Sequence, residues 1–279
     1  MFTRVALGRA RVVREIRAAA PLMAQLRTPV TARGPWLTAV LDAAAASRFS
    51  GRPVAVVVEA RAQGRPEAAA FLQLRRRGPL TVVTLLGDGL APPGAPGARL
   101  LARDDEAAGL LAAGIADLFC SLRRPRQLRF TGLPLGDPTA RRLKGRFEDA
   151  LIATTRTRAL VDDLDDLGPV VRSRDPRDLE RWLPHLLARR DSARARTFLR
   201  ASARLHAAIG QLETAVVVDG DRPRAALLTL LDGPDRRPWW GFSEGGPLRT
   251  GLGSPAVTLA VPAGDWPRVP GFRNRRAGR

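Results

Sequence analysis

The sequence predicts a mixed α/β (α+β) protein of two similar halves, each with a mixed, largely antiparallel sheet flanked by helices. The first observation is an internal repeat: AVVVEARAQGRPEAAAFLQL begins at Ala55, and AVVVDGDRPRAALLTLL begins at Ala215. Repeats fix the architecture, and this spacing is close to one domain length. The second observation is the β-branched content of both copies, and the third is the helical spacing of apolar residues after them.

Each copy of the repeat predicts a three-stranded antiparallel meander. In both copies a Val-rich run meets a polar turn, RAQGRP in the first and DGDRP in the second, after which a second apolar run returns. A third apolar or aromatic run follows at residues 80–86 and 239–242. We therefore expect residues 54–86 and 214–242 to adopt the same arrangement.

Helical and strand patterns follow each meander or precede it. In the first half, acidic residues open a helix over 104–122, where they complement the positive end of the helix dipole. A strand at 127–130 and a helix over 137–147 complete a βββαβα order. In the second half, apolar residues at helical spacing predict helices over 178–190 and 192–209.

Composition shifts suggest where the domains begin and end. The segment VDDLDDLG is read as an acidic linker, and the polar, Arg-rich segment after Pro262 is read as a poorly packed tail. The expected divisions are an N-terminal helix or arm at 1–29, a first domain at 30–160, the linker at 161–168, a second, incomplete domain at 169–263, and a basic tail at 264–279.

The net charge of +19 raises the question of nucleic acid as a partner. Nearly every cation is Arg, Lys144 is the only Lys and Tyr is absent, which a GC-rich bacterial genome produces without selection for a ligand. A nucleic-acid partner is therefore not expected, although the basic stretch 123–146 keeps that alternative open. No apolar run approaches the roughly 20 residues that span a bilayer, so a cytoplasmic location is expected.

The usual catalytic and metal-binding motifs are missing from the sequence. It has no P-loop, HExxH or GxGxxG pattern, and the single cysteine, Cys120, rules out an internal disulfide or a multi-cysteine zinc site. Cys120 is expected to be a buried thiol, and the two histidines, His185 and His206, to be structural. No metal is expected.

The strongest local candidate for a binding site is LRTGLGSPAV, at residues 248–257. Ser254 suits a helix N-cap, and Gly251 and Gly253 would let backbone approach a bulky ligand closely. A helix start presents free N–H groups and partial positive charge to a pyrophosphate, and Arg249 would add a charged contact. Glu244, just after the aromatic run, is the candidate catalytic base.

Taken together, the segments WLTAVLDAAA, VVTLLGDG, LLARDDEAAGLLAAGIADLF, QLRFTGLPLGDP, ETAVVVDGDRPRAALLTLL and GSPAVTLAV resemble the CelD/BioF-like acetyltransferases of the GNAT superfamily. The resemblance covers most of residues 30–262 and implies tandem GNAT-like halves that use acetyl-CoA or another acyl-CoA. In that superfamily a [R/Q]xxGx[G/A] loop at a helix start holds the pyrophosphate, and an amine attacks the thioester directly. With Gly251 and Gly253 on that pattern, Leu248 stands where Arg or Gln is expected.

Three functions remain open at this stage. The leading one is an acyl-CoA-dependent N-acyltransferase acting on a small-molecule or peptide amine. The first rival is a non-catalytic scaffold or pseudo-enzyme, because a complete GNAT unit needs a further strand and helix after the CoA-binding helix and the second half lacks that pattern. The second rival is a basic nucleic-acid-binding protein.

Overall fold

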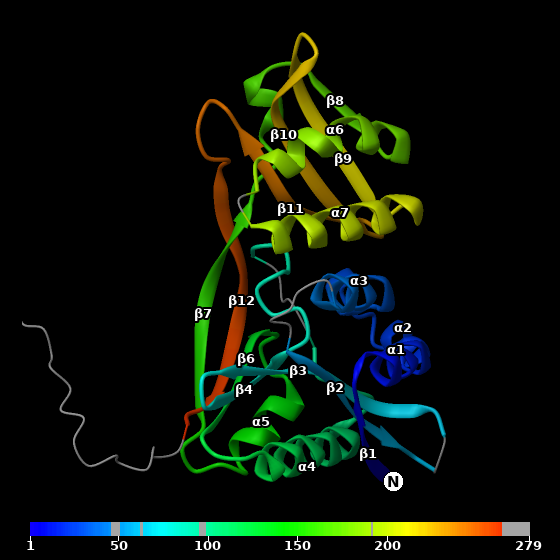
Figure 1. Cartoon of the computed structure of the whole chain (residues 1–279), viewed down its shortest axis with the longest axis vertical. Coiled ribbons are helices and arrows are strands. Elements are labelled where there is room, and N and C mark those ends of the chain that lie inside the picture. Colours follow the sequence, from blue (N-terminus) through cyan, green and yellow to red (C-terminus); the bar gives the residue numbers. More distant parts are fainter. Residues whose placement is uncertain (46–50, 62–63, 95–98, 191, 264–279) are drawn as a thin grey trace, which may run out of the picture.

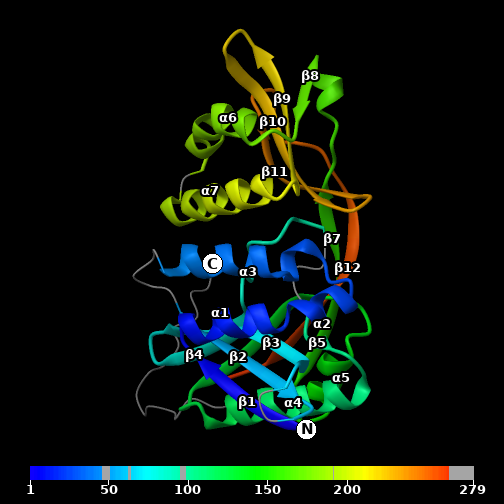
Figure 2. The same ribbon diagram turned by 90° about the vertical axis from the view of Figure 1, so that its right-hand side faces the viewer.

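The computed structural model describes residues 1–45, 51–61, 64–94, 99–190 and 192–263. Two sheets and their helices form a stack of layers (Figures 1 and 2). Helices α4 and α5 cover one face of the first sheet, and α1 to α3 cover the other face. Helices α6 and α7 of the second half follow, and the second sheet comes last. A mixed α/β architecture with two sheets agrees with the fold class predicted from the sequence.

The first sheet has eight strands, in the order β1-β2-β3-β4-β6-β12-β7, with β5 paired to β3. Its strands are β1 (Phe2–Leu7), β2 (Arg52–Glu59), β3 (Pro66–Arg77), β4 (Leu80–Leu85), β5 (Leu101–Ala102), β6 (Arg126–Leu133), β7 (Leu151–Leu160) and β12 (Thr250–Val261). The β4–β6 pair is parallel and the other pairs are antiparallel. The sheet is therefore mixed and largely antiparallel, as expected.

Helices on both faces explain why the strands in the middle of this sheet are apolar throughout. The helices are α1 (Arg9–Ala18), α2 (Ala20–Gln25), α3 (Gly34–Ala45), α4 (Asp105–Ser121) and α5 (Pro138–Lys144), with a 3-10 turn η1 (Val30–Ala32). In β2, Val54 and Val56 pack toward α4, and the intervening Ala55 packs toward the opposite helices. Successive side chains of a strand point to opposite faces, so a strand covered twice loses its alternation.

The second sheet has four strands, in the order β11-β10-β9-β8. Its elements are η2 (Leu164–Leu167), β8 (Val170–Ser173), α6 (Pro176–Ala188), α7 (Ala193–Ala208), β9 (Leu212–Asp219), β10 (Arg222–Asp232) and β11 (Asp235–Ser243). The meanders β2-β3-β4 and β9-β10-β11 have the same antiparallel connectivity, and Ala55 and Ala215 lie in the first strand of each. The predicted pair of meanders is confirmed.

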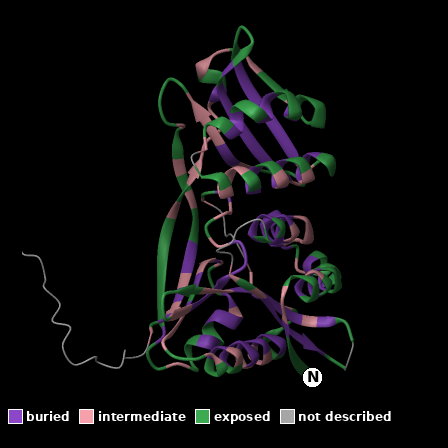
Figure 3. Cartoon of the chain, in the orientation of Figure 1, coloured by how far each residue is buried: buried purple, intermediate pink, exposed green. Residues whose placement is uncertain are grey.

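An apolar core continues from one half into the other. Helix α3 packs against α7, and the ring centroid of Trp36 lies 5.2 Å from that of Phe198 and 5.3 Å from that of Trp239, both edge-on. Trp36 is 1% exposed. Figure 3 shows much of α3 and the middle strands of the second sheet as buried. Edge-to-face aromatic packing of this kind adds to the free energy of apolar burial, so the halves form one folded unit.

Strand β12 corrects the expected boundary of the second domain. It leaves the second half and enters the first sheet between β6 and β7, where Leu259 pairs with Phe130 on one side and with Ile152 on the other (Figure 1). Residues 250–261 therefore belong to the first sheet, although the expected second domain at 169–263 included them. The two sheets are joined by two chain crossings, β7 outward and β12 back.

The N-terminal arm and the acidic linker are also more integrated than expected. Within residues 1–29, β1 is an edge strand, and Val12 and Ile16 of α1 are buried. In the acidic segment, Leu164 is fully buried, and Asp162 accepts hydrogen bonds from Arg172 at 2.6 Å and Arg236 at 3.2 Å. This segment is docked by ion pairs. The expected basic tail, residues 264–279, lies outside the described residues.

Candidate functional site

The predicted cofactor loop before Ser254 is part of a strand, so the predicted helix start is wrong. Ser254 lies within β12; its N–H donates to the Gly94 carbonyl oxygen at 2.8 Å, and its own carbonyl accepts from the Thr157 hydroxyl at 2.6 Å. The strand forms because Val257 and Leu259 fill the core beneath the first sheet. Pro255, which has no N–H to donate, sits beside a bulge where the register shifts.

Glycine at 253 serves a contact within the chain. A Cβ added to Gly253 would lie 2.5 Å from the Gly94 Cα and would also overlap the Thr157 hydroxyl. Glycine here lets the loop before α4 cross directly over the β7–β12 ribbon. A Cβ at Gly251 would lie 3.2 Å from the Val161 side chain. The sequence correctly indicated a close backbone approach, but the approaching group in this structure is the chain itself.

Arg249 and Glu244 lie on the surface of the second half and its connection. The Arg249 side chain is 68% exposed, and its Nε lies 4.0 Å from an Asp163 carboxylate oxygen. Glu244 accepts a hydrogen bond from Arg189, whose guanidinium also lies 4.9 Å from the Phe242 ring centroid. The carboxylate of Glu244 borders a cavity of about 530 Å³. It is therefore engaged in an ion pair and is not held apart as an unpartnered base.

Gly253 and Ser254 border a second cavity, of about 320 Å³, between the β7–β12 ribbon and the start of β11. Arg236 and Arg237 line it from the second half. Arg236 already binds Glu213 at 2.6 Å, and Arg237 lies 3.3 Å from Asp235. This cavity joins two of the predicted cofactor residues to two guanidinium groups that were not predicted, because Arg236 and Arg237 belong to no recognisable motif.

The start of α4, which follows the first meander, is a second place where N–H groups of a helix start could meet an anion. The Asp104 carboxylate accepts from the Ala107 N–H at 2.8 Å, and two further acidic residues, Asp105 and Glu106, occupy the first turn. The Ala107 hydrogen bond, followed by the one from Arg103, lowers the pKa of Asp104, which therefore stays ionised. Arg103 is itself paired with Glu67 at 2.5 Å.

These observations show that the described residues do not fit the pyrophosphate of an acyl-CoA at a helix start. At α4 an N–H group is already capped, and carboxylates would repel a second anion. In the second half, β11 leads into the strand β12, so the described residues form no helix there. At α4 the positive end of the helix dipole already faces carboxylates of the chain itself, and at Ser254 the described residues form no helix start.

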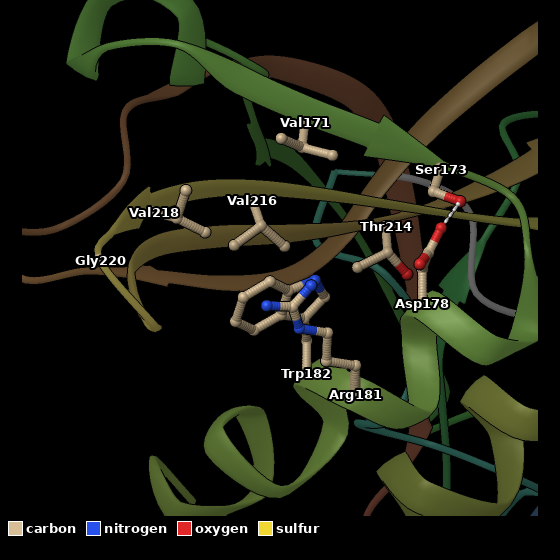
Figure 4. A pocket seen from close by; sticks show the side chains of 9 residues that line it. All are labelled: Val171, Ser173, Asp178, Arg181, Trp182, Thr214, Val216, Val218 and Gly220. Atoms are coloured by element: carbon tan, nitrogen blue, oxygen red, sulfur yellow. Dashed lines mark hydrogen bonds between the residues drawn. The ribbon is translucent and has the colours of Figure 1, made fainter.

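A small pocket in the second half was not predicted (Figure 4). It has about 150 Å³ and lies between α6 and the strands β8 and β9. The guanidinium of Arg181 lies 4.6 Å from the Trp182 ring centroid, and the Ser173 hydroxyl donates to Asp178 at 2.5 Å. Val171 of β8 and Val218 of β9 line it with partly exposed apolar side chains. It holds no histidine or cysteine, and its volume is far below the 300–1,000 Å³ typical of ligand pockets.

The sequence-based expectations for single reactive residues have mixed outcomes. Cys120 was expected to be buried but is exposed on α4. His206 is fully buried beside Trp36, and burial lowers its pKa to about 4, so its imidazole is neutral. The described residues contain no cluster of three metal-ligating side chains, and none of the described helices is long and apolar enough to cross a membrane.

No protein-family model matches the chain, and no curated protein matches it either. Among solved structures, the chain is similar to a tandem GNAT protein from the clavulanic acid biosynthesis pathway, solved without AcCoA; the identity is 14%, the alignment covers 95% of this chain and 100% of that one, and the TM-score is 0.41. A GCN5-related N-acetyltransferase from Sphaerobacter thermophilus has 10% identity, coverage of 93% and 95%, and a TM-score of 0.31.

A conserved protein from Enterococcus faecalis V583, described as a probable N-acyltransferase, has 8% identity, coverage of 94% and 73%, and a TM-score of 0.31. The names of these neighbours refer to GNAT proteins or N-acyltransferases, and the sequence segments quoted above resemble the GNAT superfamily as well. At such identities and TM-scores, the likeness transfers no activity and no residue's role to this chain.

Proposed function

We propose that this chain is a non-catalytic GNAT-like scaffold, which has two sheets in tandem but does not bind acyl-CoA at a helix start. The observation that supports the proposal is the chemistry of two places, the start of α4 and the expected pyrophosphate loop before Ser254. One is closed by the Asp104 cap and its acidic neighbours, and the other is a strand in which Ser254 hydrogen-bonds to the chain itself. The proposal also includes three expectations from the sequence: that the protein is bacterial, that it is cytoplasmic and that it holds no metal.

Calorimetric titration with acetyl-CoA tests the proposal. We expect no saturable heat up to millimolar acetyl-CoA, because three carboxylates at the start of α4 would repel a pyrophosphate there. Saturable binding at micromolar acetyl-CoA that survives in 0.3 M salt and is lost in Arg237→Gln, but kept in Arg14→Gln, would overturn the proposal. Arg14 is an exposed residue of α1, and its replacement by Gln removes the same charge as Arg237→Gln does.

The second candidate is an acyl-CoA-dependent N-acyltransferase acting on a small-molecule or peptide amine. The observation that favours it is the cavity between the two halves, where Gly253 and Ser254 lie with Arg236 and Arg237. In this candidate Arg249, Gly251, Gly253 and Ser254 contact the cofactor, and Glu244 is the base.

Release of free CoA thiol, measured against a panel of amines, tests this candidate. A rate above the protein-free background that falls in Glu244→Gln would support acyl transfer. An unchanged background with every amine, together with the absence of binding heat, would support the scaffold.

A further inference from the structure

A pocket lined by four arginines lies at one end of the first sheet, and none of its lining residues borders the three cavities described above. It has about 550 Å³ and is formed where β2 begins, β3 ends, β4 begins and α4 ends. We name it the arginine pocket. Its charged lining residues are Arg52, Arg75, Arg76 and Arg123. None of the nine residues that line it is acidic.

The cationic groups in this pocket are available for a ligand. In the described part of the chain, Arg52, Arg76 and Arg123 form no ion pair and no side-chain hydrogen bond, and all three are exposed. This sets them apart from Arg4, Arg172 and Arg236, whose guanidinium groups are each held by carboxylates. With no acidic residue in its lining, the pocket carries a local excess of positive charge.

Arg75 is the fixed member of the set. Its Nε and a terminal nitrogen donate to the Gln73 side-chain oxygen at 2.9 and 2.6 Å, and Gln73 is 1% exposed. Burial, and next the charge of Arg194, lower the pKa of Arg75, while Asp88 opposes them. Successive side chains of β3 alternate, so Arg75 and Gln73 share the face of Phe71, whereas Leu74 and Arg76 face α4. Arg75 therefore borders the pocket, and the groups offered to an anion are those of Arg52, Arg76 and Arg123.

The end of α4 would ordinarily work against an anion, because the last carbonyl groups of a helix carry partial negative charge. Here Arg126 donates to the carbonyl oxygens of Cys120 and, at 2.8 Å, of Leu122. Its guanidinium also lies 5.0 Å from the Phe119 ring centroid. These contacts satisfy the terminal carbonyls next to the pocket and remove much of their repulsion.

The backbone brings these arginines close to one another. Arg52 pairs with Leu74 across β2 and β3, and a Cβ at Gly51 would overlap the Leu74 carbonyl oxygen. Arg76 pairs with Thr81 across the next turn, and the Thr81 N–H donates to the Pro125 carbonyl at 3.1 Å. Sheet pairing therefore holds the pocket's base, and only the arginine side chains need to adjust to a ligand.

We propose that the arginine pocket binds an oligophosphate group, as found in inorganic triphosphate or in a nucleoside triphosphate. Several guanidinium groups with free donors match the multiple anionic oxygens of a phosphate chain, and Arg binds such oxygens with paired hydrogen bonds. A cavity of about 550 Å³ holds a phosphate chain with room for an attached nucleoside. This inference does not rest on the proposed scaffold function. No residue lines both the arginine pocket and the cavity beside Gly253 and Ser254.

Titration of the full chain with inorganic triphosphate at 50 mM salt tests the proposal. We expect saturable binding that weakens about tenfold or more in each of Arg76→Gln and Arg123→Gln, because a charge-assisted contact is lost. Arg76→Lys should fall between wild type and Arg76→Gln, since it keeps the charge but loses the planar fork. Arg14→Gln, the matched control, should bind as wild type does.

Three further arms complete the experiment. Equal affinity for ATP and triphosphate would assign recognition to the phosphate chain, and tighter binding of ATP would add the nucleoside; both support the proposal. Equal weakening in Arg14→Gln and Arg76→Gln would show a general charge effect and overturn it. Absence of triphosphate binding would overturn it as well, including the case in which only a single-stranded oligonucleotide binds. If acetyl-CoA binds and Arg76→Gln abolishes that binding, the acetyl-CoA site is the arginine pocket. If only Arg237→Gln abolishes acetyl-CoA binding, the scaffold proposal is contradicted.

Discussion

Acidification should destabilise this protein through one buried imidazole. His206 is fully buried against Trp36, its Nδ1 lies 3.3 Å from the Gln211 side-chain oxygen, and its Nε2 has no partner among the described residues. A proton added at Nε2 would bury a charge without an acceptor, so burial lowers the pKa from 6.5 to about 4. Above pH 6.5 both the folded and the unfolded chain hold a neutral imidazole, and no stability is lost.

Between pH 6.5 and 4 the unfolded chain takes up the proton and the folded chain does not, so the free energy of unfolding falls. The pKa depression corresponds to a loss of roughly 3 kcal/mol, complete near pH 4. The free energy of unfolding of wild type and of His206→Leu is measured by urea denaturation between pH 7 and 4. The carboxylates contribute equally to both pH dependences, so the difference between the two gives the contribution of His206. The exposed His185 gives the control His185→Gln, which should keep the full loss. Parallel pH dependences of wild type and His206→Leu would refute the reasoning.

Three further predictions concern packing. Gly253→Val should destabilise the fold by about 1–3 kcal/mol, because its Cβ has no room beside the crossing loop, whereas Gly245→Ala should be nearly neutral; thermal melting compares them, and equal melting temperatures would contradict the crowding. Trp36→Ala should cost about 3–5 kcal/mol and lower the unfolding midpoints of both halves together by urea denaturation, and two separate transitions in wild type would count against a shared core. Leu259→Ala, at a fully buried position of β12, should cost about 2–5 kcal/mol, and Leu252→Ala, 81% exposed on the same strand, should cost little; the reverse order would argue against the observed register.

Much of the fold could be predicted because its signals are local. The Val-rich runs and their turns define both meanders, and Asp104 caps α4 as the acidic start of that helix indicated. The strand β7 was missed because its side chains are mostly exposed and show no alternation, so its only evidence is a partner about one hundred residues later. Such non-local pairing leaves no mark on a short window of sequence.

The error at Ser254 has the same origin. Serine followed by proline is favoured at a helix start, and both glycines suit a ligand loop. Tertiary contacts override this local preference. Strand β12 pairs with β6 on one side and β7 on the other, and the loop that contains Gly94 crosses over β12. The arginine pocket was missed for a related reason: its four arginines come from three separate segments, and only the basic stretch at residues 123–146 stands out as a cluster in the sequence.

The return of β12 to the first sheet has a consequence for how the protein is made. A ribosome releases residues 1–160 long before residues 250–261, so β6 and β7 must wait with unpaired edges while the whole second half is synthesised. Waiting edges of this kind pair readily with other chains. We expect nascent chains arrested before residue 250 to need a chaperone. The first half should become resistant to protease only after β12 has emerged from the ribosome.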